Sequence, residues 1–407
     1  MKKIELLAPA GDLEKLKIAV DYGADAVYFG GEMFSLRAGA GNLTVAEISE
    51  GVEYAHSRGV KCHMTLNIFA HNEDIQPLRG YLEKIKDIPI DAFIVSDPGV
   101  ICLLREIIPD AELHLSTQAN MTNYVTARFW YDQGIRRLVL ARELTLKEIR
   151  QVRDEIPEDM ELEAFVQGAM CISYSGRCLL SNFMIDRDAN RGQCAHPCRW
   201  KYKLVEEQRP GEYYPVEEDS RGTYILNSKD LCMLEHIPEL AQAGVSSAKI
   251  EGRMKSVFYV ATIVSAYRRA IDAYYDDPDN YQFDPSWMTE LKKASHREFT
   301  TGFYFDKPTN EDQNYQTSAY TRDYSFIGMV KAYDSLTCMA VVEQRNKMVL
   351  GDEIEVFGPG RDYFTQKLDV LLDEEGEPIE AAPHPQQIVR IKMAQPVAEK
   401  YILRKRK

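Results

Sequence analysis

The chain has 407 residues, 45% of them hydrophobic, and a formal net charge of −14 at pH 7. A chain of this length can bury a large core without disulfides, and no run approaches the roughly 18 apolar residues of a membrane-spanning helix. The acidic balance argues against binding nucleic acid through overall charge, although it leaves a local basic patch open. The first residues do not resemble a secretory signal, so we expect a cytoplasmic protein that does not enter a membrane.

Short β-like runs alternate with amphipathic helical stretches over the first two thirds of the chain. Strands are predicted at residues 4–8, 25–29, 60–66, 92–95, 112–115, 137–140, 161–166 and 247–251. Helices are predicted at residues 12–22, 45–58, 75–88, 98–108, 122–133, 145–156, 231–242 and 256–275. This alternation is typical of a TIM-type (β/α)8 barrel. A doubly wound sheet is the alternative, but residues 39–44 lack the third glycine of the dinucleotide-binding fingerprint.

The pattern divides the chain into a barrel at residues 1–280, a polar linker at 281–325 and a small all-β barrel domain at 326–407. A short helix is predicted in the linker, at 288–295. The last part shows β-segments at 326–330, 337–342, 352–357 and 387–391, punctuated by glycines. The basic residues 404–407 are interpreted as a solvated tail.

Five cysteines cluster in an insertion at residues 171–232, directly after the seventh predicted strand: Cys171, Cys178, Cys194, Cys198 and Cys232. Functional groups of TIM barrels lie at the carboxyl ends of strands, so the cluster falls where a site is expected. Clustered cysteines in a long cytosolic chain favour a metal centre over disulfides. Their irregular spacing fits zinc and radical-SAM patterns poorly and an iron–sulfur cluster better. Buried structural cysteines are the remaining alternative.

The segment from Glu163 to Ser181, EAFVQGAMCISYSGRCLLS, resembles the signature of peptidase family U32. The resemblance continues in residues 6–11, 28–31, 114–118, 227–232, 249–253 and 296–302, and therefore covers nearly the whole chain. The length and domain order of the chain are similar to those of the branch of the family that acts in tRNA hydroxylation. Several members resemble oxygen-independent hydroxylases that carry a 4Fe–4S cluster and act on the tRNA wobble uridine, ribosomal RNA or the ubiquinone ring. Prephenate is implicated as the hydroxyl source.

By that resemblance, the ligands of the 4Fe–4S cluster map onto Cys171, Cys178, Cys194 and Cys232, with Cys198 as a fifth cysteine. Which of Cys194 and Cys198 binds iron is left open. Beside them, basic and aromatic residues interleave over residues 191–203, a composition suited to phosphate contact and base stacking. Arg199 and Lys201 are therefore candidate RNA contacts, and an exposed β-ribbon is the alternative.

Polar residues at or near the predicted strand ends are candidates for handling substrate: Asn67, His114, Gln118, Arg142, Glu163, Gln167, Lys249, Glu251 and Arg253. Arg142, Lys249 and Arg253 could bind a dicarboxylate such as prephenate, or form structural ion pairs across the barrel mouth. His114 is the first candidate for proton transfer and His296 the second, and Glu163 completes the predicted catalytic set.

These observations lead to the hypothesis of an iron–sulfur enzyme that hydroxylates the tRNA wobble uridine to 5-hydroxyuridine, with tRNA and a small dicarboxylate as partners. A collagenase-type peptidase is the first alternative, although the sequence shows neither a nucleophile motif nor a zinc-protease helix. An RNA-binding scaffold with a structural metal is the second. The sequence leaves a partner chain open.

Overall fold

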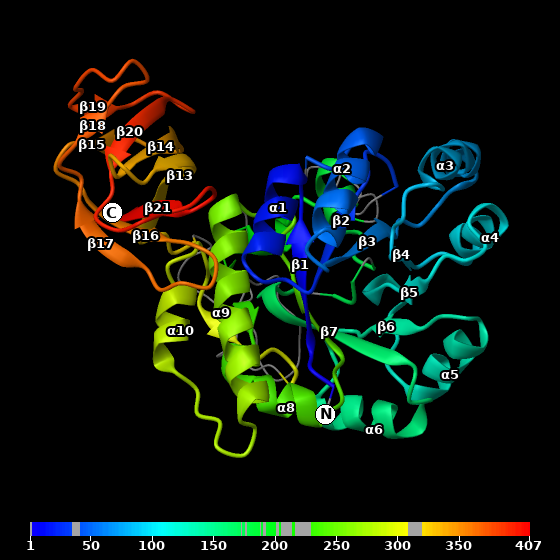
Figure 1. Ribbon diagram of the computed structural model, residues 1–407. Helices are drawn as coiled ribbons and strands as arrows, with labels where there is room; N and C mark the ends of the chain where they lie inside the picture. Colours follow the sequence, from blue (N-terminus) through cyan, green and yellow to red (C-terminus); the bar gives the residue numbers. More distant parts are fainter. Residues whose placement is uncertain are drawn as a thin grey trace.

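The computed structural model describes residues 2–34, 41–171, 173–175, 177–187, 189, 193–200, 203–204, 214–215, 229–307 and 320–407. Within these residues, eight parallel strands close a barrel, because β11 pairs with both β7 and β1 (Figure 1). The expected TIM-type barrel is therefore confirmed. The strands are nearly continuous apolar runs, as parallel strands covered on both faces require. Helices cover the outside of the barrel.

The barrel strands lie close to their predicted positions. They are β1 (Glu5–Ala10), β2 (Ala26–Gly30), β3 (Lys61–Leu66), β4 (Ala92–Val95), β5 (Leu113–Leu115), β6 (Arg137–Val139), β7 (Glu161–Ala169) and β11 (Ser247–Ile250). The helices of this part are α1 (Leu13–Asp21), α2 (Val45–His56), α3 (Asn72–Ile85), α4 (Pro98–Ile107), α5 (Tyr124–Asp132), α6 (Leu146–Glu155), α7 (Leu180–Ile185), α8 (Ile237–Gln242), α9 (Val257–Asp276) and α10 (Pro285–Leu291). Short 3-10 helices are η1 (Thr117–Ala119), η3 (Pro197–Arg199) and η4 (Leu234–His236).

The helix starts follow local sequence signals. Thr44 and Thr145 each form a capping box with the glutamate three residues on, which satisfies backbone N–H groups at the starts of α2 and α6. The helix predicted at 231–242 was wrong over its first half. Residues Asp230–Cys232 form β10, which pairs antiparallel with β7 and parallel with β12 (Phe299–Thr300), and α8 begins only at Ile237. Pairing with β7 satisfies the backbone of this segment, and tertiary contact overrides helix propensity.

The C-terminal part forms the expected small β-domain, an antiparallel sheet curled into a half-barrel. In the described residues its strand order is β17-β16-β21-β13-β14-β20-β18. The strands are β13 (Tyr324–Asp334), β14 (Met339–Gln344), β16 (Glu353–Phe357), β17 (Phe364–Lys367), β18 (Leu371–Leu372), β20 (Ile388–Lys392) and β21 (Ile402–Arg406). A short additional pair in this domain joins β15 (Met348–Val349) to β19 (Ala381–Ala382). In the cysteine-rich insertion of the barrel part, β8 (Lys203–Leu204) pairs with β9 (Tyr214–Pro215).

The interpretation of residues 404–407 as a solvated tail was wrong for Arg404, whereas Arg406 and Lys407 are exposed. β21 lies between β16 and β13, and Arg404 is completely buried. Its Nε donates to Glu355 Oε2 at 2.7 Å, and its Nη2 donates to Glu290 Oε2 of α10 at 2.6 Å. Sequence charge suggested solvent, but two carboxylates neutralise the charge of the buried guanidinium instead.

The β-domain lies beside α1, α9 and α10 (Figure 1), and polar contacts join the two parts. Tyr22 of α1 donates a hydrogen bond to the carbonyl of Lys400 at 2.9 Å, and the Lys400 ammonium binds Asp21 at 2.8 Å. Arg345 forms an ion pair with Glu14. Together with the Arg404 contacts, these interactions hold the C-terminal half-barrel against the side of the (β/α)8 barrel. The C-terminal domain therefore does not cover the carboxyl ends of the barrel strands.

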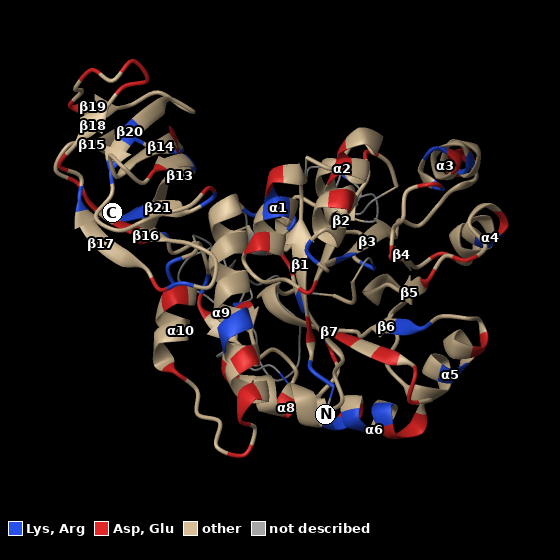
Figure 2. Ribbon diagram, in the orientation of Figure 1, with Lys and Arg blue, Asp and Glu red and all other residues tan. Residues whose placement is uncertain are grey.

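Acidic residues lie mainly on the outer helices and on the loops of the C-terminal sheet (Figure 2). None of the helices that the structure describes is both long and apolar enough to cross a membrane.

Candidate functional site at the barrel mouth

A pocket of about 60 Å³ lies at the carboxyl ends of the barrel strands. The predicted substrate residues that line it are Asn67, Gln118, Arg142, Lys249, Glu251 and Arg253. The structure therefore brings together residues that the strand-end rule selected from four different segments, at or after β3, β5, β6 and β11. A larger cavity, of about 330 Å³, lies between α9, α10 and the C-terminal sheet, away from the strand ends.

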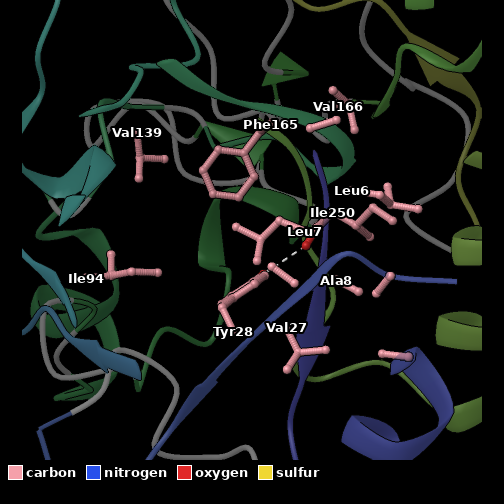
Figure 3. Close-up of a cluster of buried hydrophobic side chains, with 14 of the residues drawn as sticks. Leu6, Leu7, Ala8, Val27, Tyr28, Ile94, Val139, Phe165, Val166 and Ile250 are labelled. Atoms are coloured by element: carbon pink, nitrogen blue, oxygen red, sulfur yellow. Dashed lines mark hydrogen bonds between the residues drawn. The ribbon is translucent and has the colours of Figure 1, made fainter. Parts of the chain in front are cut away.

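Part of the pocket wall is apolar, although most of the lining residues are polar or charged. Tyr28, Ile94, Val139 and Phe165 project from four strands toward the same interior space (Figure 3). The Tyr28 hydroxyl donates to the carbonyl of Ile250 at 2.9 Å, which fixes the ring across the barrel. Apolar walls strengthen the electrostatic interactions of the polar groups that lie beside them.

Arginines form the cationic part of the lining. Arg142 donates to the carbonyl of Ala169 at 2.7 Å and lies 4.2 Å from the Phe165 ring centroid. Arg253 donates to Thr65 Oγ1 at 3.1 Å. Among the described residues, Arg142 Nε and the lining atom Gln118 Oε1 are buried without a hydrogen-bond partner. Buried polar atoms usually have partners, so these atoms point to a ligand or water in the pocket.

Lys249 connects the pocket to an ion network beneath it. Its Nζ donates to Glu163 Oε1 at 2.6 Å, and Arg137 Nη1 donates to Glu163 Oε2 at 3.3 Å. Arg137 also pairs with Glu5 and Glu161. Burial raises the pKa of Glu163, but Lys249 and Arg137 outweigh it and hold this pKa below its usual range. Glu163 is therefore ionised, and both of its oxygens are occupied.

His114 and His63 lie beside this network rather than in the pocket lining. Their rings meet edge to face at 4.8 Å between centroids, and both are buried. His114 Nε2 lies 2.8 Å from Glu112 Oε1, so this nitrogen carries the proton. Burial lowers the pKa of both histidines, which are neutral at pH 7. The predicted proton donor thus lies one residue below the strand end, where Ser116 begins the pocket lining.

Other predicted residues lie elsewhere. Gln167 is buried in β7 and accepts a hydrogen bond from Tyr267 at 3.1 Å, without lining the pocket. His296 hydrogen-bonds to the carbonyl of Ala294 and stacks on Phe299, also outside the lining. Lys201 and the side chain of Arg199 lie outside the described residues.

Sequence reasoning missed Tyr28, Thr65, Ser116, Thr117, Phe165 and Ser175, which also line the pocket. Tyr28 and Thr65 lie within predicted strands, one or two residues before their ends. Alternation along a strand places every second side chain in the barrel interior, and this signal could have identified them. Ser175 belongs to the cysteine-rich insertion, whose path no periodic pattern indicates.

All eight cysteines are among the described residues, and none forms a disulfide. Cys171 is exposed just beyond β7, Cys178 precedes α7, and Cys194 and Cys198 lie before and within η3. Cys232 differs from these four because it is buried, at the end of β10. It pairs with Gln167 of β7, which precedes Cys171 by four residues. Burial raises the pKa of the Cys232 thiol to about 11.

These thiols fit an iron–sulfur cluster in donor type and in their origin from neighbouring segments beside β7 and β10. Among the described residues, no group of three cysteine sulfurs lies within the 4.8 Å span of a single-ion site. A cubane distributes its ligands over four irons, so its thiolates need not approach so closely. The residues therefore fit the cluster in donor type, and Cys194 and Cys198, before and within η3, are the two candidates for its third ligand.

Comparison with known proteins identifies the family to which the chain belongs. The model of peptidase family U32 matches residues 11–314, and that of the U32 C-terminal domain matches residues 322–404. The chain belongs to peptidase family U32. This U32 protein is 45% identical to tRNA hydroxylation protein P1 of Bacillus subtilis, over 100% of its own length and 96% of the relative. It is 38% identical to tRNA hydroxylation protein P of Escherichia coli, over 94% and 92%. It is also 33% identical to a collagenase of Porphyromonas gingivalis, over 91% and 90%.

Proposed function

We propose that this protein is a tRNA hydroxylase that forms 5-hydroxyuridine at the wobble position without molecular oxygen. The observation that supports the proposal most strongly is similarity at full length to relatives named tRNA hydroxylation proteins. The barrel adds a site of suitable chemistry, because the pocket at its mouth joins cations to apolar walls. A fold of this kind supports many reactions, so the argument rests on the site and the relatives.

The pocket would hold one carboxylate-bearing end of a dicarboxylate such as prephenate, the proposed hydroxyl source. Arg142 and Arg253 offer planar guanidinium groups that bind carboxylates through paired hydrogen bonds. The partnerless Arg142 Nε supplies a donor that needs no rearrangement. Tyr28 and Phe165 would cover the apolar part of the molecule and exclude water from it.

A 4Fe–4S cluster would be held by Cys171, Cys178, Cys194 and Cys232, the set that the family resemblance implies, with Cys198 as the alternative to Cys194. Bound there, the cluster would supply electron transfer or Lewis acidity. The thiols themselves must lose their protons to bind iron. The buried Cys232, with its raised pKa, is the ligand for which this costs most.

The RNA would approach over the cysteine-rich insertion, which reaches the pocket through Ser175. Tyr174, Phe183 and Trp200 of this insertion are exposed aromatic side chains. Unstacked RNA bases stack on such side chains, and the exposed Arg177 and Arg187 offer phosphate contacts. These features support delivery of a displaced uridine to the barrel mouth.

The test is nucleoside analysis of tRNA from cells that lack the gene and carry chosen variants. We expect 5-hydroxyuridine to disappear in the deletion and to return with wild type. Arg142→Gln should fail to restore it. Arg128→Gln is the matched control, because Arg128 pairs with Glu155 on the outer surface, and it should restore the nucleoside fully. Unchanged 5-hydroxyuridine in the deletion strain would refute the proposal.

The cluster has a separate test, iron and acid-labile sulfide analysis after anaerobic purification. We expect about four of each per chain. Cys171→Ser should lose them, and Cys102→Ser, which changes an exposed cysteine of α4, should keep them. Comparison of Cys194→Ser with Cys198→Ser then identifies the third ligand. Stoichiometric zinc, or no metal in the wild type, would contradict the cluster.

A peptidase is the second candidate, favoured by the collagenase among the relatives. Incubation of the purified protein with gelatin and casein tests it directly. Cleavage of either substrate that persists after Arg142→Gln would favour the peptidase hypothesis over hydroxylation.

A further inference from the structure

We propose that Lys249 is a carbonyl-reactive lysine, whose ε-amine forms an imine with the keto group of a small 2-oxo acid in the barrel-mouth pocket. The inference rests on the proposed function in one respect, the binding of a small carboxylate at this site, and adds a covalent step. It concerns this pocket alone and is independent of which RNA is modified.

The size of the pocket suits the head of such an acid. Its volume of about 60 Å³ corresponds to roughly four to six water-sized positions, enough for a carboxylate, a carbonyl and a short carbon stem. Arg142 and Arg253 line it together with Lys249. A carboxylate bound to these arginines would bring its neighbouring C2 atom to the side of the pocket where Lys249 lies.

The surroundings of the amine are those that activate a lysine as a nucleophile. Lys249 Nζ lies 4.3 Å from the ring centroid of Tyr28 and 5.5 Å from that of Phe165, and its side chain is 5% exposed. Burial lowers the pKa of Lys249; Glu163 opposes this effect, and Arg253 and Arg137 add to it. Desolvation and adjacent cations are the established routes to a reactive amine.

Glu163 provides the proton transfers that imine formation needs. Its Oε1 lies 2.6 Å from Lys249 Nζ, and Arg137 fixes its other oxygen. The ammonium gives a proton to Glu163, and the free amine attacks C2, so a C–N bond forms and the C=O π bond breaks. A proton then passes from the attacking nitrogen to the former carbonyl oxygen, which becomes a hydroxyl. Glu163 then returns its proton to that hydroxyl, which leaves as water.

Imine formation balances without an electron donor or acceptor and leaves the charges of the buried ion network unchanged. An ammonium and a ketone yield a protonated imine and one water, with no oxidant or reductant. The charge at position 249 is unchanged, so its ion pair with Glu163 persists and no uncompensated charge appears in the barrel. The product keeps the acid in the pocket and withdraws electrons from its C2 atom.

The test is reductive trapping of the full-length protein with pyruvate as the probe and sodium cyanoborohydride as the reductant. We expect intact mass to show one reduced adduct per chain and peptide mapping to place it on Lys249. Lys249→Arg keeps the positive charge beside Glu163 and should abolish the adduct. Lys255→Arg is the matched control, because Lys255 lies six residues away and outside the pocket lining, and it should be trapped like wild type.

Arg142→Gln should lower the trapping rate by about tenfold, as expected for loss of a charge-assisted contact to the carboxylate. Trapping only on surface lysines, or equal trapping in Lys249→Arg, would overturn the inference. Absence of any adduct at saturating pyruvate would also overturn it. The proposed hydroxylation is judged separately by 5-hydroxyuridine in tRNA, and it survives if that nucleoside still depends on the gene.

Discussion

The barrel encloses Glu163, Lys249 and Arg137 beneath its pocket, whereas the C-terminal sheet encloses aliphatic side chains such as Ile354 and Leu403. Both interiors exclude water, but the buried charges of the barrel lie beside its pocket, whereas the buried Arg404 of the C-terminal sheet pairs with Glu355 and with Glu290 of α10. Buried ion pairs contribute little to stability compared with apolar packing, because desolvation offsets their attraction. The difference indicates that the barrel interior is arranged for a site and that the C-terminal core is arranged for cohesion.

Glu163→Gln should produce the largest effect in this comparison. The amide keeps the shape of the side chain but leaves Lys249 and Arg137 with one fewer counter-charge. We expect a loss of about 3–5 kcal/mol in the free energy of unfolding, measured by chemical denaturation. The double variant Glu163→Gln/Lys249→Met should recover part of it. A loss below about 1 kcal/mol would mean that the charges are not coupled.

Leu403→Ala tests the apolar interior. Leu403 is fully buried in β21, and its truncation removes apolar contacts and leaves a cavity. We expect a loss of about 2–5 kcal/mol in the same measurement. Pyruvate trapping at Lys249 should be unchanged in the folded protein, because the cavity lies in the other domain. Reduced trapping would show that the two interiors are coupled.

Acid provides a third probe, through Glu161. Burial raises the pKa of Glu161, but Arg137 and Lys2 outweigh it, and the pKa falls to about 2. A depressed pKa stabilises the folded state above the ordinary carboxyl pKa, near 4.5, and this stability is lost as pH falls toward 2. Glu161→Gln should remove on the order of 2 kcal/mol of that dependence in pH-stability curves. A variant curve parallel to wild type would contradict the assignment.

Tyr28→Phe should have the smallest effect. The ring remains beside Lys249, but the carbonyl of Ile250 loses its hydrogen bond. We expect a loss of about 1 kcal/mol in unfolding free energy. Trapping of pyruvate should continue, since the ring wall is intact. Abolished trapping would instead show that the hydroxyl takes part in the imine chemistry.

The barrel and much of its pocket could be predicted because both depend on local pattern. Strand periodicity located the barrel, and the strand-end rule selected residues such as Gln118 and Arg253, which the structure brings into one lining. The position of His114 could not be predicted so well, because β5 ends only one residue later and the histidine remains below the pocket. Depth in a barrel depends on the stagger of neighbouring strands, which a single sequence does not display.

Other errors have the same origin, a long-range partner that the local pattern does not show. Leu231 and Cys232 have a helical pattern, yet pairing with β7 makes them a strand. Arg404 belongs to a basic run, yet Glu355 and Glu290 make it a buried residue. The family signature, in contrast, identified the chain correctly because it depends on residue identity rather than on spatial neighbours.

The position of β21 has a consequence for the order of events during translation. β16 and β13 each pair with β21 and not with one another, although β21 follows both in the chain. Until the ribosome has released β21, each of these strands presents an unpaired edge. Open edges recruit strands from other chains, so the nascent β-domain is the part of this protein most exposed to misassembly. Stalling before residue 402 should therefore yield a soluble barrel that carries an aggregation-prone C-terminal half.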